Sequence, residues 1–393
     1  MLKTILTAAL AFCGIALAAQ TPLERVLGEI ERNNPSLKSA RLDQEAMFLE
    51  NKEEALLPDP ELEFNYLWGK DNARRHDFSI SQSIDFALLS GQRSNLSSGK
   101  NALASLEYKA MRQDVLLEAE KACIELVYYN ALEQELSFHF SNAQTLVDAY
   151  KRALELGESS ALEMNNAMLH HTDIKGQLEK VRVGKKKAQL LLKSLNGGQE
   201  PSLNLSDFNS LGMSPLSPDF ESFFDNASAA SPAVNYAKSK IDVSEAELNI
   251  NRSAWIPGLS IGYMAEVAQP EAYRGLTFGV SIPLWSNSNK VKQSKAKYTA
   301  AKMQKDETIQ AFYFQLLSLY NEASALKSIA ESYRAALDTF DNRELLKKAR
   351  QQGEISLIEY ISELDLYYEN LLETLEAEKD YKMALAELTA VLL

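Results

Sequence analysis

Two regions of the chain alternate strictly between apolar and polar residues. In the first region, apolar residues recur at every second position from Leu62 to Trp68 and from Phe78 to Phe86, and only Gln82 interrupts the alternation. A period of two is typical of a β-strand whose two faces meet different surroundings. The second region repeats the pattern. The sequence therefore predicts two hairpins, whose four strands lie at 61–69, 76–87, 258–267 and 274–285.

The predicted strands have the length that a tilted strand needs to cross a bilayer, about 9–11 residues. The sequence offers no further strand-like segment to pair with their edges, and an unpaired edge cannot persist in lipid. We therefore expect other copies of the chain to supply the partners. Two copies would give eight strands around a filled interior, and three would give twelve around a lumen. The alternative is a soluble sheet, which is the commoner setting for a single alternating hairpin.

Outside the hairpins, apolar residues recur with alternating spacings of four and three. One such series runs from Val115 to Leu154 with Glu133 as its single polar exception, and another runs from Ile309 to Phe340. This spacing is the seam of a coiled coil. A second series, from Leu103 to Phe138, lies on the other flank of the first helix. Seams on both flanks predict a helix packed between two neighbours, as in an α-helical barrel, whereas an ordinary bundle would show one contiguous apolar arc.

Four landmarks recur at a nearly constant offset of about 197 residues, so the chain contains one plan twice. The corresponding pairs are Asn34-Pro35 with Ser231-Pro232, Leu57-Pro58 with Ile256-Pro257, Ile84 with Ile282, and Gly157-Glu158 with Gly353-Glu354.

The landmarks predict a first repeat at 20–195 and a second at 230–393. Each contains a helix, two strands, a long helix, a tip at Gly157 or Gly353, and a returning helix. The intervening segment, 196–229, is rich in Gly, Pro and Ser and is interpreted as a short connector, a reduced equatorial segment.

Residues 1–19 have the pattern of a secretory signal peptide. Lys3 is their only charge, an apolar run follows, and Ala16-Leu17-Ala18 offers a cleavage site with small residues. Lipidation at Cys13 is the less favoured alternative because the bulky Phe12 precedes it. Removal of the segment would leave Cys123 as the only cysteine, so no internal disulfide is expected.

Composition narrows the classes of function. The chain has 393 residues, with 41 Lys and Arg against 54 Asp and Glu, and a net charge of −13. A protein that binds polyphosphate needs a basic surface, which excludes nucleic acid as a partner. After the first segment, no stretch approaches the roughly 18 apolar residues of a transmembrane helix.

The sequence contains no pattern typical of catalysis. The adjacent pair His170 and His171 lies on a predicted helix and points in two directions, unlike chelating histidines four residues apart. We interpret these two, with His76 and His139, as surface residues. Gly197-Gly198 is not followed by the lysine of a phosphate-binding loop. The sequence therefore predicts no enzyme, no cofactor and no metal site.

Several motifs resemble the TolC-type outer membrane efflux protein family, over essentially the whole chain after the signal segment. They are Asn34-Pro35-x-Leu37-Lys38 with Ala40-Arg41, Leu57-Pro58-Asp59-Pro60, the strand-to-helix turn Gly91-Gln92-Arg93, and the paired glycines Gly157 and Gly353. The resemblance implies a mainly α-helical homotrimer. Its chains would build a 12-stranded membrane β-barrel, in contact with outer membrane lipid, and a long coiled-coil α-barrel across the periplasm of a Gram-negative bacterium.

The resemblance also implies roles for residues near the two tips. A periplasmic adaptor would dock on the tip residues Gly157, Glu158, Ser159, Gly353, Glu354 and Ser356. A periplasmic gate would include Glu359, Ser362 and Glu163, although the family often has an acidic residue at the place of Ser362. Independently of the resemblance, we expect the tip glycines to end helices, and Ser159-Ser160 and Ser356 to cap the returning ones.

The resemblance thus implies an outer membrane channel, the passive exit duct of a tripartite efflux or type I secretion system that works with a periplasmic adaptor and an inner-membrane pump. The alternative is a periplasmic coiled-coil scaffold or adaptor protein with soluble hairpins. An adaptor would need a Gly-rich domain with further strands, and the sequence has none.

Overall fold

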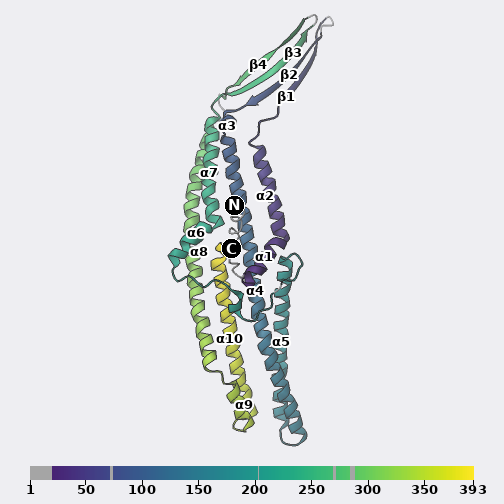
Figure 1. Ribbon diagram of the computed structural model, residues 1–393, viewed down its shortest axis with the longest axis vertical. Coiled ribbons are helices and arrows are strands. Elements are labelled where there is room, and N and C mark those ends of the chain that lie inside the picture. Colours follow the sequence, from purple (N-terminus) through teal and green to yellow (C-terminus); the bar gives the residue numbers. More distant parts are fainter. Residues whose placement is uncertain (1–19, 71–73, 202, 269–270, 284–287) are drawn as a thin grey trace, which may run out of the picture. The chain divides into compact units, whose positions relative to one another are not determined.

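The computed structural model describes residues 20–70, 74–201, 203–268, 271–283 and 288–393 (Figure 1). The expected signal segment lies outside the described residues. The chain divides into two compact units, each built from both halves of the sequence. The sheet unit consists of Pro35–Val115, Ser217–Glu322 and Glu387–Leu393. The tip unit consists of the described residues up to Asn34, with Leu116–Leu216 and Ala323–Ala386.

Four antiparallel strands of the sheet unit form one sheet in the order β1–β2–β3–β4 (Figure 1). Their bounds are Glu61–Trp68, Arg74–Ile84, Gly258–Ala268 and Glu271–Ser281. The alternating pattern predicted the strands but treated the hairpins as separate. Pairing of β2 with β3 joins them, so within the described residues only the outer edges of β1 and β4 lack a neighbouring strand.

The largest differences from the predicted strand bounds are in β2 and β4. Strand β2 ends at Ile84 rather than at 87, because the Asp85 carboxylate accepts the backbone N–H of Leu88 at 2.8 Å and caps the short helix α3, Phe86–Leu89. Strand β4 occupies Glu271–Ser281 rather than 274–285, and the last two residues of the predicted strand lie outside the described residues.

The strand register gathers apolar residues on one face of the sheet. One row across the four strands consists of Leu62, Ile80, Tyr263 and Leu276. In the single chain these side chains are exposed by 38–69%. The neighbouring row on the opposite face is small and polar, with Glu61, Ser81, Gly262 and Thr277. The sheet is therefore amphipathic, with large apolar side chains exposed on one side.

Gln82, the exception in the alternating pattern, lies on the apolar face. Its amide donates to the carbonyl of Pro58 at 2.8 Å and to that of Ser83 at 3.1 Å. The polar side chain thus bonds the backbone where the chain enters β1.

The helices of the sheet unit are α2 (Pro35–Glu53), α3, the first part of α4 (Gln92–Glu155), α6 (Phe220–Ala230), α7 (Pro232–Ser253), the first part of α8 (Ser288–Thr339) and the 3₁₀ turn η3 (Ala390–Leu392). Helix α6 lies within the predicted connector. It precedes α7 as α1 (Pro22–Asn33) precedes α2, and in both places a proline begins the second helix. Helix α6 therefore stands before α7 in the chain as α1 stands before α2.

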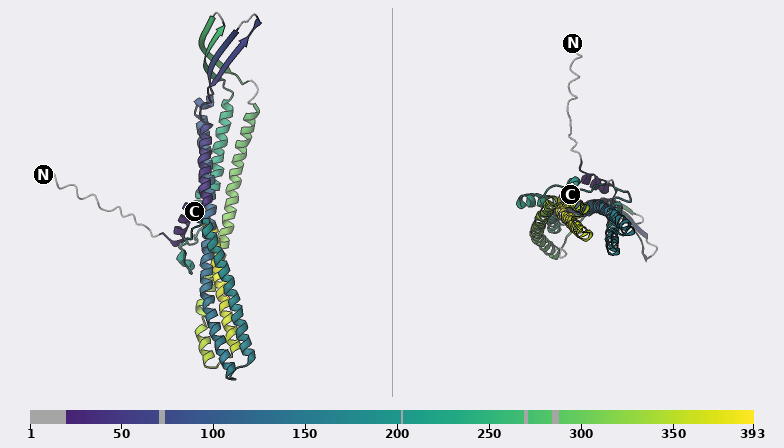
Figure 2. Two further views of the ribbon diagram at one scale, coloured as in Figure 1. Left: turned by 90° about the vertical axis from the view of Figure 1, so that its right-hand side faces the viewer. Right: turned by 90° about the horizontal axis from the view of Figure 1, so that it is seen from below.

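The tip unit contains α1, the remainder of α4, α5 (Ala161–Leu195), the 3₁₀ turn η2 (Phe208–Leu211), the end of α8, α9 (Arg343–Gln351) and most of α10 (Leu357–Thr389). The long helices lie side by side in the order α5, α4, α10, α8 (Figures 1 and 2). The predicted α4 seam supplies their core through the buried residues Ala119, Ala122, Leu126, Leu136, Ala143, Val147 and Tyr150.

The second long helix is shorter than its seam predicted. It ends at Thr339, and three residues separate it from α9. The Asp341 carboxylate accepts from the backbone N–H of Arg343 at 3.2 Å and from its guanidinium at 2.8 and 3.0 Å. These local bonds compete with helical ones, and the seam residue Phe340 is 70% exposed.

Glu133, the polar exception in the α4 seam, bonds the neighbouring helix. Its carboxylate accepts from Lys185 at 2.7 Å and from Arg182 at 3.2 Å, both on α5. The hydrogen bond from Lys185, followed by that from Arg182, lowers the pKa of Glu133. A charged group therefore replaces an apolar contact between α4 and α5.

Within the described residues, every helix is too polar or too short to be a membrane span.

Candidate functional site

Both predicted tip glycines adopt the left-handed backbone that ends a helix. Gly157 has φ 76° and Gly353 has φ 73°. At the first tip, Glu158 N–H donates to Ala153 O at 2.8 Å and Gly157 N–H to Leu154 O at 3.1 Å. The equivalent bonds at the second tip measure 2.9 and 3.2 Å. This pair of bonds is the Schellman motif.

The returning helices start with identical capping boxes. Ser160 Oγ accepts the Glu163 N–H at 3.2 Å, while Glu163 Oε2 accepts the Ser160 N–H at 2.9 Å. Ser356 and Glu359 exchange the same two bonds at 3.2 and 2.8 Å. The expected caps are therefore present, and Ser159 contributes a hydroxyl that donates to Glu163 at 3.0 Å.

The capping boxes give the two predicted gate carboxylates a local role. The hydrogen bonds from Ser160 and Ser159 lower the pKa of Glu163, and those from Ser356 lower the pKa of Glu359. Both carboxylates are thus held ionised at helix N-termini, where a negative charge is stabilising. The third predicted gate residue, Ser362, is exposed on α10. This role has a local signal, since Ser-x-x-Glu is the capping-box pattern.

The helices next to the two tips contact each other within the tip unit. The guanidinium of Arg350, just before the second tip, donates to the hydroxyl of Tyr150 on α4 and to the Ile355 carbonyl. Tyr150 also belongs to a buried cluster with Val147, Ala167 and Leu357. Residues of α4, α5 and α10 therefore form a common core immediately behind the tips.

A second arginine connects the region further from the tips. Arg343 at the start of α9 pairs with Asp341 at 2.8 Å and lies 3.7 Å from Glu135 on α4. Its guanidinium also lies over the Tyr367 ring, 4.5 Å from the centroid. The second hairpin is thus joined to α4 by charged contacts at two levels.

The predicted strand-to-helix turn connects several segments of the sheet unit. Gly91 has φ 72°, and α4 begins directly after it at Gln92. Arg93 pairs with Asp85 at the end of β2 and donates to the Glu54 carbonyl at 3.5 Å. Gln92 accepts from Ser253 at 2.9 Å, at the end of α7. The turn therefore ties both helix-to-strand crossings to the start of α4.

The interpretation of the histidines as surface residues is wrong for His170, whose side chain is 9% exposed, and for His139. This side chain is 3% exposed, and burial followed by the nearby His170 lowers its pKa to about 3. His171 stacks on Phe140 with 4.7 Å between ring centroids. The residues that approach His139 come from other helices, so no local spacing could have shown their proximity.

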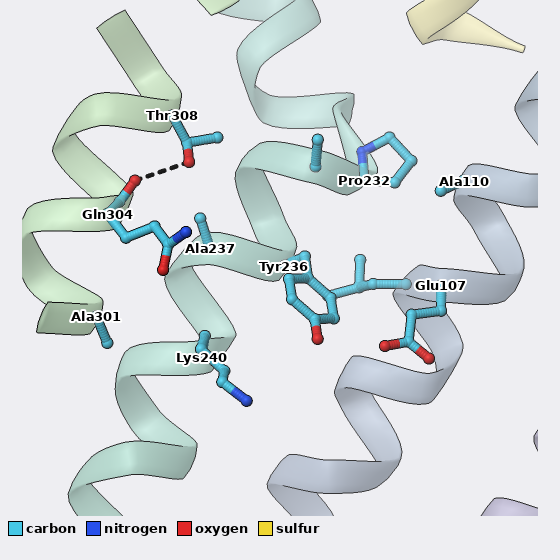
Figure 3. Close-up of a pocket in the computed structure, with 11 residues that line it drawn as sticks. Glu107, Ala110, Pro232, Tyr236, Ala237, Lys240, Ala301, Gln304 and Thr308 are labelled. Carbon is cyan, nitrogen blue, oxygen red and sulfur yellow. Dashed lines mark hydrogen bonds between the residues drawn. The ribbon is translucent and has the colours of Figure 1, made fainter. Parts of the chain in front are cut away.

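A cavity of about 440 Å³ opens between α4, α7 and α8 of the sheet unit (Figure 3). Its lining includes four alanines, Pro232 and the ring of Tyr236. Glu107 and Lys240 are its charged lining residues. Its lining residues include neither histidine nor cysteine.

Three solved structures share this fold at low sequence identity. CusC, described in terms of transmembrane channel formation, is 14% identical over 94% of this chain and 92% of its own, with a TM-score of 0.77. The outer membrane protein VceC from Vibrio cholerae is 12% identical over 94% of both chains, with a TM-score of 0.70. The open MtrE outer membrane channel of Neisseria gonorrhoeae is 13% identical over 95% of this chain and 89% of its own, with a TM-score of 0.71.

No protein-family model matches the sequence, and no curated protein matches it. The structural similarity extends over almost the whole length of each chain. It confirms the fold that the resemblance implied, long helices with a four-stranded antiparallel sheet.

Proposed function

We propose that this chain is the outer membrane exit duct of a tripartite efflux or type I secretion system. Three copies form a 12-stranded barrel in the outer membrane of a Gram-negative bacterium, with a large helical portion in the periplasm. The duct is passive and catalyses no reaction. The observation that carries the proposal is the four-stranded sheet, which is apolar on one face and open at both edges.

The dimensions of the sheet suit a bilayer. Strands β2, β3 and β4 each have 11 residues. At about 3.3 Å per residue such a strand extends about 36 Å. Tilted by about 40°, it covers about 28 Å, close to the thickness of the hydrocarbon core.

The open edges support assembly with other copies. In lipid, the unpaired backbone groups along β1 and β4 would each cost several kcal/mol. Pairing β4 of one copy with β1 of the next removes this cost, and no additional strand is needed. Three copies contribute twelve strands, enough to surround a lumen, whereas eight strands leave room only for side chains.

The face opposite the apolar rows supports an aqueous lumen. It carries Glu63, Asp77 and Glu266, together with serines. Glu266 pairs with Arg75 at 3.0 Å, and Asp77 accepts from Asn65 at 3.1 Å. A lumen of hydroxyls and partly paired charges admits polar solutes and requires no chemical step.

In this assembly the tips serve as the docking surface for a periplasmic adaptor, which connects the duct to an inner-membrane pump. The docking residues are Gly157, Glu158, Ser159, Gly353, Glu354 and Ser356. All lie at the ends of the helical hairpins, where Glu158 and Glu354 are exposed. Glu163, Glu359 and Ser362 lie within two turns of the tips and line the periplasmic entrance.

Cysteine crosslinking between strand edges tests the assembly. In a Cys123→Ala background, Phe64→Cys on β1 is combined with one β4 substitution at a time on the same face, Leu276→Cys, Phe278→Cys or Val280→Cys. Oxidation of outer membrane fractions is expected to give covalent dimers and trimers for at least one pair. Larger ladders, or monomers throughout, would overturn the trimer.

The matched control places both cysteines in one chain. Phe64 and Phe78 are direct partners between β1 and β2, so Phe64→Cys with Phe78→Cys should crosslink without forming oligomers. Extraction with carbonate or urea tests the location of the protein. Retention in the outer membrane is expected, and release would favour the periplasmic scaffold instead.

A further inference from the structure

Three side chains from three helices of the tip unit converge in a cluster of potential metal ligands. His139 lies on α4, His170 on α5 and Asp365 on α10. One potential ligand atom of each residue lies within 4.8 Å of the other two. Within the described part of the chain, it is the only group of three or more His, Cys, Asp or Glu side chains whose potential ligand atoms lie this close together.

His139 supplies a buried imidazole with an unused nitrogen. Its ring stacks on Tyr368 with 3.6 Å between centroids and 9° between planes, and it meets the edge of the His170 ring at 5.3 Å. The stacking determines the plane of the ring. Nε2 is buried and has no hydrogen-bond partner. An unpaired buried nitrogen is unfavourable unless something else binds it.

His170 and Asp365 complete the donor set. His170 Nδ1 lies 3.5 Å from Asp365 Oδ1. Two ligands of a tetrahedral zinc ion, each at about 2.1 Å, are about 3.4 Å apart, so this pair already has the required separation. The other pairs lie within 4.8 Å, so they must approach by at most about 1.4 Å to reach the same separation.

The surroundings supply negative charge and a route from solvent. The Asp365 side chain is 50% exposed, whereas that of His170 is 9% exposed, so the cluster runs from the surface into the core. Asp173, one turn beyond His170, acts electrostatically on both His170 and Asp365. The arginines of the adjoining cavity of about 380 Å³ are engaged elsewhere, Arg343 with Asp341 and Arg350 with Tyr150.

We propose that His139, His170 and Asp365 bind one divalent transition-metal ion. Two imidazoles and one carboxylate form a borderline donor set that suits Zn²⁺, and water would complete the coordination. The bound ion would tie α4 and α5 to α10, and so join the hairpin of the first tip to that of the second. This site is independent of the proposed duct function, because its three ligands come from a single chain.

Titration of the full-length protein with Zn²⁺ tests the site. The protein is purified in detergent, stripped with EDTA, dialysed, and titrated calorimetrically with the metal salt alone. We expect one saturable Zn²⁺ per chain above the weak background of an acidic surface. Removal of a ligand should weaken this binding by at least about tenfold, as in His170→Gln and Asp365→Asn. Replacement of Zn²⁺ by Co²⁺ should give the visible absorption of a tetrahedral site in the native chain and in the control described next, but not in the two ligand variants.

His171→Gln is the matched control, since His171 is adjacent in sequence but packs on Phe140 outside the cluster. It should bind Zn²⁺ like the native chain. Asp365→Asn alters a half-exposed side chain and should leave the circular dichroism unchanged, so lost binding is not lost folding. The proposal is overturned if the two ligand variants bind Zn²⁺ as tightly as the control and the native chain do. It is also overturned if the native chain shows no saturable site.

Discussion

Substitution of Ser356 by alanine should loosen the first turn of α10 while leaving the charge of Glu359 in place. The hydroxyl of Ser356 accepts the Glu359 N–H at 3.2 Å. Its loss leaves that N–H to water, at a cost of about 1 kcal/mol. This corresponds to about fivefold faster hydrogen exchange for amides that open with this turn.

Glu359→Gln should keep the first turn of α10 closed but remove the charge of the side chain. Glutamine can replace glutamate in a capping box, so exchange in the first turn should stay within about twofold of the native rate. The charge, however, is removed. Because hydrogen bonding lowers the pKa of Glu359 in the folded state, its contribution to stability is present above its unfolded pKa. That contribution is lost as the pH falls through the folded value.

Hydrogen exchange measured by mass spectrometry on peptides covering residues 356–362 separates the two roles, and single-channel conductance tests the proposed gate. Ser356→Ala should change exchange, whereas Glu359→Gln should change conductance. The same pair exists at the first tip as Ser160 and Glu163, which provides an independent replicate. The reasoning is refuted if Ser356→Ala exchanges at the native rate, or if Glu359→Gln loosens the turn as much as Ser356→Ala does.

Three further substitutions test other parts of the structure. Burial raises the pKa of Glu120 to about 7, so native stability should fall as the pH rises from about 4.5 to 7. In the native chain this should lower the free energy of unfolding by about 3 kcal/mol between pH 4 and pH 8, measured by urea unfolding, and Glu120→Gln should remove that fall. The prediction is contradicted if the free energy of unfolding depends on pH equally in both proteins. Glu133→Ala should cost less than about 1 kcal/mol, and less still in high salt, in thermal unfolding followed by circular dichroism. A Cβ added at Gly353 would meet no atom within 4 Å, but the backbone there has φ 73°, which is strained for alanine. In Gly353→Ala, local hydrogen exchange at the second tip should therefore become faster by the equivalent of about 1 kcal/mol. An unchanged exchange rate would argue against the left-handed backbone.

Local patterns predicted most of the fold. The alternation around Phe64 and Phe278 gave the strands, and the glycines at 157 and 353 gave the tips, because both signals depend on a few adjacent residues. The capping boxes were accessible for the same reason. The break at Asp341 was missed because the apolar seam continues to Phe340, and a side chain that bonds its own backbone does not alter that spacing.

Features that depend on distant segments could not be derived in this way. The pairing of β2 with β3 joins two hairpins from different repeats. The cluster around His139 needs three helices to be packed before its members meet. A seam analysis places His139 on α4 but gives no information about Tyr368 or Asp365. Local patterns therefore predicted the elements, whereas the contacts between distant segments required the structure.

The open edges of the sheet have a consequence for genetics. In the proposed ring of three, each chain supplies one β1 edge and one β4 edge, so a chain with either edge blocked would interrupt the whole barrel. When intact and edge-blocked chains are made in equal amounts and mix freely, only about one ring in eight contains three intact chains. An edge mutation would consequently be dominant in a cell that still carries the normal gene, whereas a mutation that prevents folding of the chain would be recessive.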